Sequence, residues 1–239
     1  MEACAAFLRD LHPDLLCLQE VRPAAWKLLR DRLPVRDAAY APRIDGRAAG
    51  EGVPALLLSD QWHCAHKERF WFSETPDTPS VSWRAAHPRV CSVLRLRPAN
   101  APDTSSALHL FNLHLDHRSR RSRARSLGLL RERIHSTAVS GDHIVICGDF
   151  NMPGYRKEVR DFLAGTPPLR DATHHHPIGA VRPTYLGWGP FRLAKARIDL
   201  CLHSPGLHAD HYHAVTPEHR GQTISDHRAV VVDFSSSDD

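Results

Sequence analysis

The stretch Ile144-Val-Ile-Cys-Gly-Asp149-Phe-Asn151 places an acid and an amide directly after a short apolar run. Apolar runs of this length, bounded by turn-forming residues, are typical of strands buried inside a sheet. We therefore predict a strand over 144–149, with Asp149 at its end and Asn151 just beyond it. A simple Gly-Asp turn would explain the same residues, since both favour turns.

Four further apolar stretches also carry polar residues at or near one end. Each residue has an ordinary explanation when taken alone: a glutamate after a strand usually caps a helix or faces water, and a histidine within one is often a satisfied core residue. Their recurrence on five strands favours a shared site, because a strand has no structural need for such groups. The residues are Glu20 after strand 14–19, Asn112 and His114 in strand 108–115, Asp199 in strand 197–203, and Asp226 and His227 before strand 229–234.

Helices and two more strands complete the pattern around these five stretches. Apolar residues at helical spacing predict four helices, and further apolar runs predict the additional strands. This mixture indicates an α/β fold in which helices cover sheets. Without an internal repeat or composition shift, we expect one domain over 1–234 and a disordered tail over 235–239. The helices are predicted over 4–11, from Pro23, over 119–138 and over 157–163, and the strands over 53–59 and 90–97.

The bulk composition is that of an ordinary globular domain. Of 239 residues, 42% are hydrophobic and 24% charged. No apolar run approaches the roughly 20 residues of a membrane-spanning helix, and the first residues lack the basic segment of a signal peptide. Six cysteines without a C-x-x-C pair favour buried thiols in a reducing compartment. We expect a cytoplasmic monomer with no membrane partner, and the net charge of +4 mildly favours an anionic partner.

The residue types at the strand ends suit one kind of chemistry. Carboxylate and amide oxygens favour hard cations such as Mg²⁺ or Mn²⁺, which keep several waters and bind substrate phosphate directly. Imidazole beside a carboxylate titrates near neutrality and can orient or deprotonate a water. Together these groups predict hydrolysis of a phosphoester. A zinc protein using the many histidines is disfavoured, because no H-E-x-x-H or comparable ligand spacing occurs.

Five short segments in one order resemble the endonuclease/exonuclease/phosphatase superfamily, the group of DNase I and the apurinic endonucleases. The segment Phe70–Pro79 further resembles a bacterial subgroup of that superfamily. The resemblance implies a DNase I-like four-layer sandwich, with two packed mixed β-sheets, helices outside and the site at one rim. The five segments are Leu18-Gln-Glu20, Phe111-Asn-Leu-His114-Leu-Asp-His117, Gly148-Asp-Phe-Asn151, Arg197-Ile-Asp199 and Ser225-Asp-His227.

The resemblance also implies roles for the central residues. Glu20 looks like a ligand of Mg²⁺ or Mn²⁺. Asp149 looks like the residue that orients or activates the attacking water. Asn151 looks like a hydrogen-bond donor to the phosphoryl oxygens, and His114 like a phosphate ligand.

A second group would complete the acid–base and metal-binding set. Asp199 and His227 look like acid–base residues. Asp226 looks like a further metal ligand that also holds the His227 ring. Glu74 looks like an acid that supports a histidine, and Asn112 is a second supporting residue. These assignments predict a metal-dependent hydrolase, most simply of phosphodiesters.

The chain departs from the family at its start. Relatives open with a strand that ends in an asparagine of the metal site, whereas this sequence begins at the following helix. The sequence therefore suggests that the first strand is missing, which would leave unpaired backbone beside strand 14–19 and weaken metal binding. A weak or inactive truncated member that acts as a binding module is the alternative function.

Three residues are candidates for substrate contact. Arg121 lies in an arginine-rich stretch after His117 that could hold a nucleic-acid backbone. Trp188 could stack on a base, and Arg197 could bind phosphate beside Asp199. Charged helix starts and loop aromatics also occur without any ligand. A phosphorylated metabolite or lipid head group is therefore an equal alternative to nucleic acid.

Overall fold

A mixed six-stranded sheet forms the centre of the computed structural model, which describes residues 1–102, 104–174, 181–188 and 196–236. Its middle strands are largely apolar and bury side chains on both faces. The pair β6 and β7 is parallel, and the other neighbours are antiparallel. In spatial order the strands are β4 (Trp62–Trp71), β5 (Val90–Pro98), β6 (Leu108–His114), β7 (His143–Asp149), β9 (Asp199–His203) and β8 (Arg170–Asp171).

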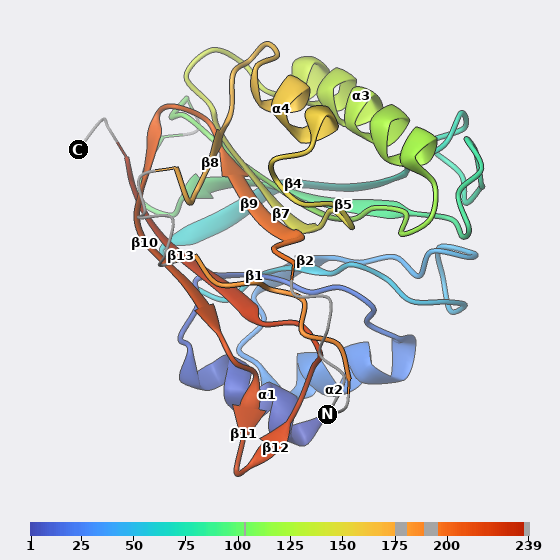
Figure 1. Ribbon diagram of the computed structural model, residues 1–239. Helices are drawn as coiled ribbons and strands as arrows, with labels where there is room; N and C mark the ends of the chain where they lie inside the picture. The colour runs from blue at the N-terminus through green and yellow to red at the C-terminus, as the bar shows by residue number, and fades with distance from the viewer. Residues whose placement is uncertain (103, 175–180, 189–195, 237–239) are drawn as a thin grey trace.

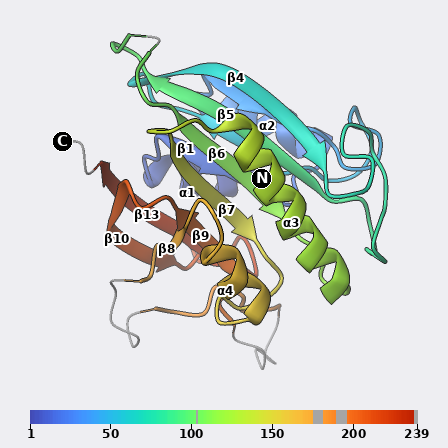
Figure 2. The same cartoon turned by 90° about the horizontal axis from the view of Figure 1, so that it is seen from above.

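Helix α3 (Arg120–Thr137) provides the crossover that the parallel strands β6 and β7 require. It begins at Ser119, whose side chain accepts a hydrogen bond from a backbone N–H of the first turn. Helix α4 (Lys157–Leu163) packs beside it, and Figure 2 shows both helices over the same face of the sheet. The apolar face of α3 is buried in one core cluster with β6 and β7, through Leu127, Leu130 and Ile134.

Smaller antiparallel sheets cover the opposite face (Figure 1). One has the order β1-β3-β2, and another pairs β10 with β13. Helices α1 and α2 pack outside this layer, so the chain forms helix, sheet, sheet and helix layers. Among the described residues, β1 pairs with β3 and lies at a sheet edge. The elements are α1 (Glu2–Asp10), β1 (Leu15–Cys17), α2 (Pro23–Arg32), β2 (Asp37–Ala39), β3 (Ala55–Leu57), β10 (Leu207–Val215), β11 (Glu218–His219), β12 (Gln222–Thr223) and β13 (Ala229–Ser236).

The α/β class and the DNase I-like layering predicted from sequence are confirmed. Two long strands, β4 and β10, were not predicted. In β10 the buried residues Leu207, Ala209 and Tyr212 alternate with exposed polar ones, but a register shift after Ala209 breaks the alternation. β4 is an edge strand whose middle is charged and exposed.

The end of the domain also differs from the expected boundary. β13 continues through Ser236, where Ser235 and Ser236 pair with β10. The tail expected from residue 235 is therefore partly strand, and residues 237–239 lie outside the described part. Among the described helices, none has the length and apolar composition needed to cross a membrane.

Candidate active site

Three polar side chains lie in one row across the central sheet. β6 and β7 are in parallel register with His114 beside Asp149, and β9 places Asp199 beside Asp149 from the other side. The His114 Nε2 and Asp149 Oδ2 atoms are 3.5 Å apart. Three of the strand ends that looked informative in the sequence, those of β6, β7 and β9, therefore meet at one edge of one sheet.

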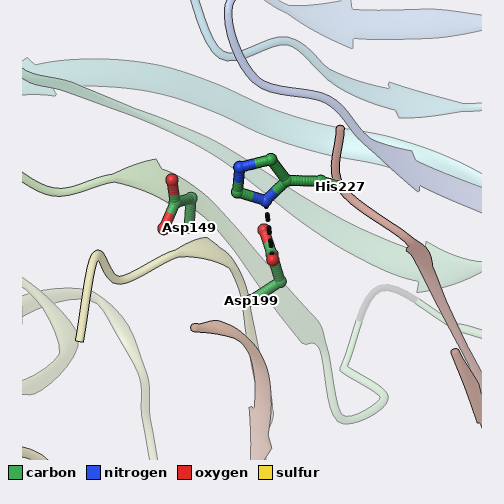
Figure 3. A group of neighbouring side chains, drawn as sticks. All are labelled: Asp149, Asp199 and His227. Carbon is green, nitrogen blue, oxygen red and sulfur yellow. Dashed lines mark hydrogen bonds and ion pairs between the residues drawn. The ribbon is translucent and has the colours of Figure 1, made fainter. Parts of the chain in front are cut away.

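His227 reaches this row from the segment before β13. Its ring Nδ1 lies 2.8 Å from Asp199 Oδ2. Figure 3 shows the side chains of Asp149, Asp199 and His227 pointing toward one another. A backbone bridge between Tyr185 and His227 and a hydrogen bond from the His227 N–H to Ser225 Oγ (3.0 Å) fix this segment. The ring thus has a defined orientation.

The row has unusual electrostatics. Burial, and then the negative charge of Asp199, raises the pKa of Asp149 to about 7. Burial alone would lower the pKa of His227, but the hydrogen bond and charge of Asp199 outweigh it and raise that pKa to about 9. Burial, together with Arg89 and Arg43, holds the pKa of His114 well below its ordinary value. Near neutrality the row therefore combines a carboxyl group close to its pKa, a protonated imidazole and a neutral one.

The turn after β7 holds Asp149 in place. The backbone N–H of Asn151 donates to Asp149 Oδ1 at 2.7 Å, and the Asn151 side-chain amide donates to the Leu115 carbonyl at 2.9 Å. Gly148 has a φ of 142°, and a Cβ there would lie 1.9 Å from the Leu113 carbonyl oxygen. Only glycine therefore fits at position 148, immediately before Asp149.

Asn112 connects the central sheet to the segment that carries Glu20. It is fully buried in β6, and its Nδ2 donates to the carbonyls of Leu18 (2.9 Å) and Pro54 (2.7 Å). Its Oδ1 accepts a hydrogen bond of 2.8 Å from Gln19 Nε2. Asn112 thus satisfies its polar groups on Pro54 and on the residues just before Glu20, and so holds that segment against β6.

Glu20 lines a small cavity together with His114. Two arginines that sequence reasoning missed, Arg43 and Arg89, line the same cavity. The sequence held one positional signal for Arg89, which directly precedes the apolar strand β5. Arg43 lies in a Gly-rich loop, where an arginine is ordinarily solvated.

Several predicted residues lie apart from the row. Arg197 is bound to Asp171, with Nη2 to Oδ2 at 2.7 Å and Nη1 to Oδ1 at 3.2 Å. Glu74 accepts a hydrogen bond of 3.1 Å from Trp83 Nε1, and no histidine contact of Glu74 is found in the described residues. Arg121 is an exposed residue of α3.

Asp226 and Trp188 are the remaining predicted residues, and Asp226 directly precedes His227 in the sequence. Asp226 is half-buried, and its charge contributes to the raised pKa of His227. Its carbonyl accepts a hydrogen bond of 2.8 Å from the Leu186 N–H. Trp188 is 65% exposed, as a side chain free to meet a ligand must be.

The donor set fits a hard cation. Asp149, Asp199 and His227 each offer a ligand atom, and these atoms lie within 4.8 Å of one another. Ligation through His227 would need a neutral ring, and the hydrogen bond and charge of Asp199 raise the pKa of that ring to about 9. The Glu20 carboxylate is exposed, with no hydrogen-bond or ion-pair partner in the described part of the chain. Carboxylate oxygens are the ligands that Mg²⁺ and Mn²⁺ prefer.

Known proteins share this fold and sequence pattern. The model of the endonuclease/exonuclease/phosphatase family matches residues 1–227. A mannosyl-6-phosphatase of Bacteroides thetaiotaomicron is 26% identical, with 97% of this chain and 88% of that chain covered and a TM-score of 0.83. A search of curated proteins gave no match.

Two further structures are less similar and show the fold alone. D. rerio TDP2 complexed with a single-strand DNA product is 18% identical, with 98% and 92% covered and a TM-score of 0.76. The human Nocturnin catalytic domain with a bound sulfate anion is 20% identical, with 99% and 87% covered and a TM-score of 0.74. Because the family model matches nearly the whole length of this chain, the chain belongs to the endonuclease/exonuclease/phosphatase family.

Proposed function

We propose that this protein is a divalent-metal-dependent phosphoester hydrolase in which Asp149 and His227 assist the attack of water. The observation that carries the proposal is the placement of Asp149 beside the hydrogen-bonded pair Asp199 and His227. At slightly alkaline pH, the pKa values of Asp149 (about 7) and His227 (about 9) leave Asp149 deprotonated and His227 protonated. A base and an acid side by side are what general acid–base hydrolysis needs.

The chain's own residues divide the work. Asp149 orients the attacking water and accepts its proton, because its pKa lies close to the working pH. His227, held by Asp199, donates a hydrogen bond or a proton to the oxygens that gain charge. His114 is neutral, so its ring N–H donates to a phosphoryl oxygen without competing for the water's proton. Asn151, adjoining Asp149, offers its remaining amide hydrogen to the phosphate.

Glu20 and Asp226 are the residues that we assign to Mg²⁺ or Mn²⁺. A bound divalent ion supplies Lewis-acid stabilisation of the phosphoryl oxygens. Carboxylate oxygens are the ligands these ions prefer. The exposed carboxylate of Glu20 supplies such an oxygen without disturbing the Asp199–His227 hydrogen bond. The preceding residue, Gln19, is held in place by its hydrogen bond to Asn112.

Two substrate classes have support, one from exposed residues of this chain and one from a relative. Nucleic acid is supported by exposed Trp188 and Arg121. A phosphorylated metabolite is supported by the 26% identical mannosyl-6-phosphatase. The non-catalytic alternative, a binding module of the same ancestry, predicts phosphate binding without turnover.

Hydrolysis of bis-p-nitrophenyl phosphate and p-nitrophenyl phosphate, with Mg²⁺, with Mn²⁺ and with EDTA, tests the proposal. We expect activity only with metal, and Glu20→Gln should raise the metal concentration needed for half-maximal activity. Glu132→Gln, at an exposed acid of α3, is the matched control and should leave this concentration unchanged. Activity that persists in EDTA would reject the metal requirement, and metal-loaded protein without turnover of either ester would favour the binding module.

A further inference from the structure

A small cavity beside the catalytic row has a cationic lining that the acid–base mechanism does not use. It measures about 10 Å³, room for a single water-sized group. His114 forms part of its wall, so the cavity adjoins the row of candidate catalytic residues. Arg43 and Arg89 contribute two guanidinium groups, and Glu20 and Glu51 contribute carboxylates.

Arg89 is the more deeply buried of the two arginines. Only 3% of its side chain is exposed, and it directly precedes β5 at the end where that strand pairs with the end of β6. Its Nη2 lies 2.9 Å from His117 Nδ1, and its Nε lies 3.6 Å from Asp116 Oδ2. Among the described residues, Nε and Nη1 have no hydrogen-bond partner. A buried cation with unused donors is costly unless a ligand satisfies them.

Arg43 is held rigidly at the other side of the cavity. Its backbone N–H donates to the Glu51 carbonyl at 2.9 Å, and its own carbonyl accepts from Trp71 Nε1 at 2.8 Å. Its Nη2 pairs with Glu51 Oε2 at 3.0 Å, whereas its Nε is buried without a hydrogen-bond partner in the described residues. The side chain is therefore fixed before any ligand arrives, which reduces the entropy lost on binding.

The charges around the cavity favour an anion. Burial, and then the nearby charge of Arg43, lowers the pKa of Arg89. Glu51 is already engaged by Arg43 and, at 3.6 Å, by Arg22. Glu20 is the carboxylate that the proposed function assigns to the metal. A ligand oxygen with negative charge would complete the hydrogen bonding of both arginines.

We propose that Arg43 and Arg89 bind a terminal oxygen of the substrate phosphate, and that the preferred substrate is therefore a phosphomonoester. The substrate class rests on the proposed hydrolase function. A monoester has three terminal oxygens and a charge of about −1.5 to −2 near pH 7, whereas a diester has two such oxygens and one charge. The cavity volume of about 10 Å³ matches a single oxygen atom, and its two guanidinium groups match the larger negative charge of a monoester.

Kinetics on two esters test the specificity. We compare p-nitrophenyl phosphate with bis-p-nitrophenyl phosphate for the wild type, Arg43→Gln and Arg89→Gln, with the exposed Arg9→Gln as the control. The wild type should prefer the monoester, and each cavity variant should lower kcat/KM for it at least tenfold more than for the diester. A wild-type preference for the diester, or equal losses on both esters, would overturn the inference.

Binding of inorganic phosphate separates this inference from the hydrolase proposal. In an Asp149→Asn background with Mg²⁺, calorimetry should show phosphate binding that Arg43→Gln weakens at least tenfold and Arg9→Gln leaves unchanged. Such binding without turnover by the wild type would reject the hydrolase but support the anion site. Unchanged affinity in Arg43→Gln would reject the site, and this variant carries the test if Arg89→Gln fails to fold.

Discussion

The two ends of the paired strands β6 and β7 each carry a histidine beside an aspartate, with opposite properties. At the starting end, His109 Nε2 lies 2.7 Å from Asp142 Oδ2, and the two side chains are 1% and 3% exposed. At the other end, His114 and Asp149 adjoin Asp199 and His227, whose side chains are 13% and 27% exposed. We infer that the same residue types serve a structural purpose at one end and, under the proposed function, a chemical one at the other.

Saturation of the carboxylate accounts for the difference. Asp142 accepts hydrogen bonds from the backbone N–H groups of Ala107 and Val139 as well as from His109, and these hold its pKa below the ordinary value despite burial. Asp149 has the Asn151 N–H, but burial and the charge of Asp199 raise its pKa to about 7. A saturated pair stabilises the fold, whereas a pair next to a second carboxylate is ready to exchange a proton.

The largest expected effect is loss of activity on removal of His227. His227→Ala should reduce kcat/KM by ~10²–10⁴-fold, the usual contribution of acid–base catalysis. Thermal unfolding should change little, since the ring is partly exposed. Steady-state kinetics and a melting curve on the same preparation check both points. An activity within a factor of two of wild type would contradict the assignment.

The opposite outcome is expected for His109→Ala. Because the substitution leaves the buried Asp142 carboxylate without its ring partner, the free energy of unfolding should fall by about 1–3 kcal/mol. Activity per folded molecule should be retained. Urea denaturation and active-fraction kinetics measure the two quantities, and a large loss of kcat with unchanged stability would place His109 in the chemistry.

The pH profile of Asp199→Asn sharpens the role of the second carboxylate. In the wild type, loss of the Asp149 proton near pH 7 and of the His227 proton near pH 9 should bound the active range. The charge of Asp199 raises both pKa values, so its removal should lower both and move the whole kcat/KM profile toward acid. A profile whose two limbs stay in place would show that Asp199 does not set these pKa values.

The smallest effect is expected at Arg197, which the sequence suggested as a substrate contact. Since Arg197 is bound to Asp171 by two hydrogen bonds, Arg197→Gln should leave KM within about twofold and cost about 1 kcal/mol of stability. A tenfold rise in KM with unchanged stability would restore the substrate role.

The sequence predicted the strands whose hydrophobic pattern matches their burial in the sheet. The apolar run of β7 and the apolar residues of β6, interrupted by His109 and Asn112, identified the central strands. Asp149 follows Gly148 at the end of the β7 run. The polar strands β4 and β10 were missed because packing against a neighbouring sheet, rather than intrinsic pattern, makes them strands.

The site shows the same limit. His114, Asp149, Asp199 and His227 were chosen by position, and strand register brings them together. Arg43 was not predictable, because its burial depends on tertiary contacts to Trp71 and Glu51. Tertiary contacts that no sequence pattern reveals also decide that Arg197 binds Asp171 and that Glu74 binds Trp83.

The central claim is tested most directly by comparing substitutions of Asp149, at the end of β7, and of Asp142, in the turn before β7. Asp149→Asn and Asp142→Asn are measured side by side for metal-dependent turnover of p-nitrophenyl phosphate and its bis ester and for unfolding in urea. Asp149→Asn should lose ~10²–10⁴-fold in activity. Its stability at pH 8 should equal or exceed that of the wild type, because burying the Asp149 carboxyl costs stability progressively as pH rises from the ordinary carboxyl pKa to the raised value of about 7, and an amide has no such cost. Asp142→Asn should lose about 1–3 kcal/mol of stability and keep its activity per folded molecule. Equal losses of activity in both variants, or full activity in Asp149→Asn, would contradict the account.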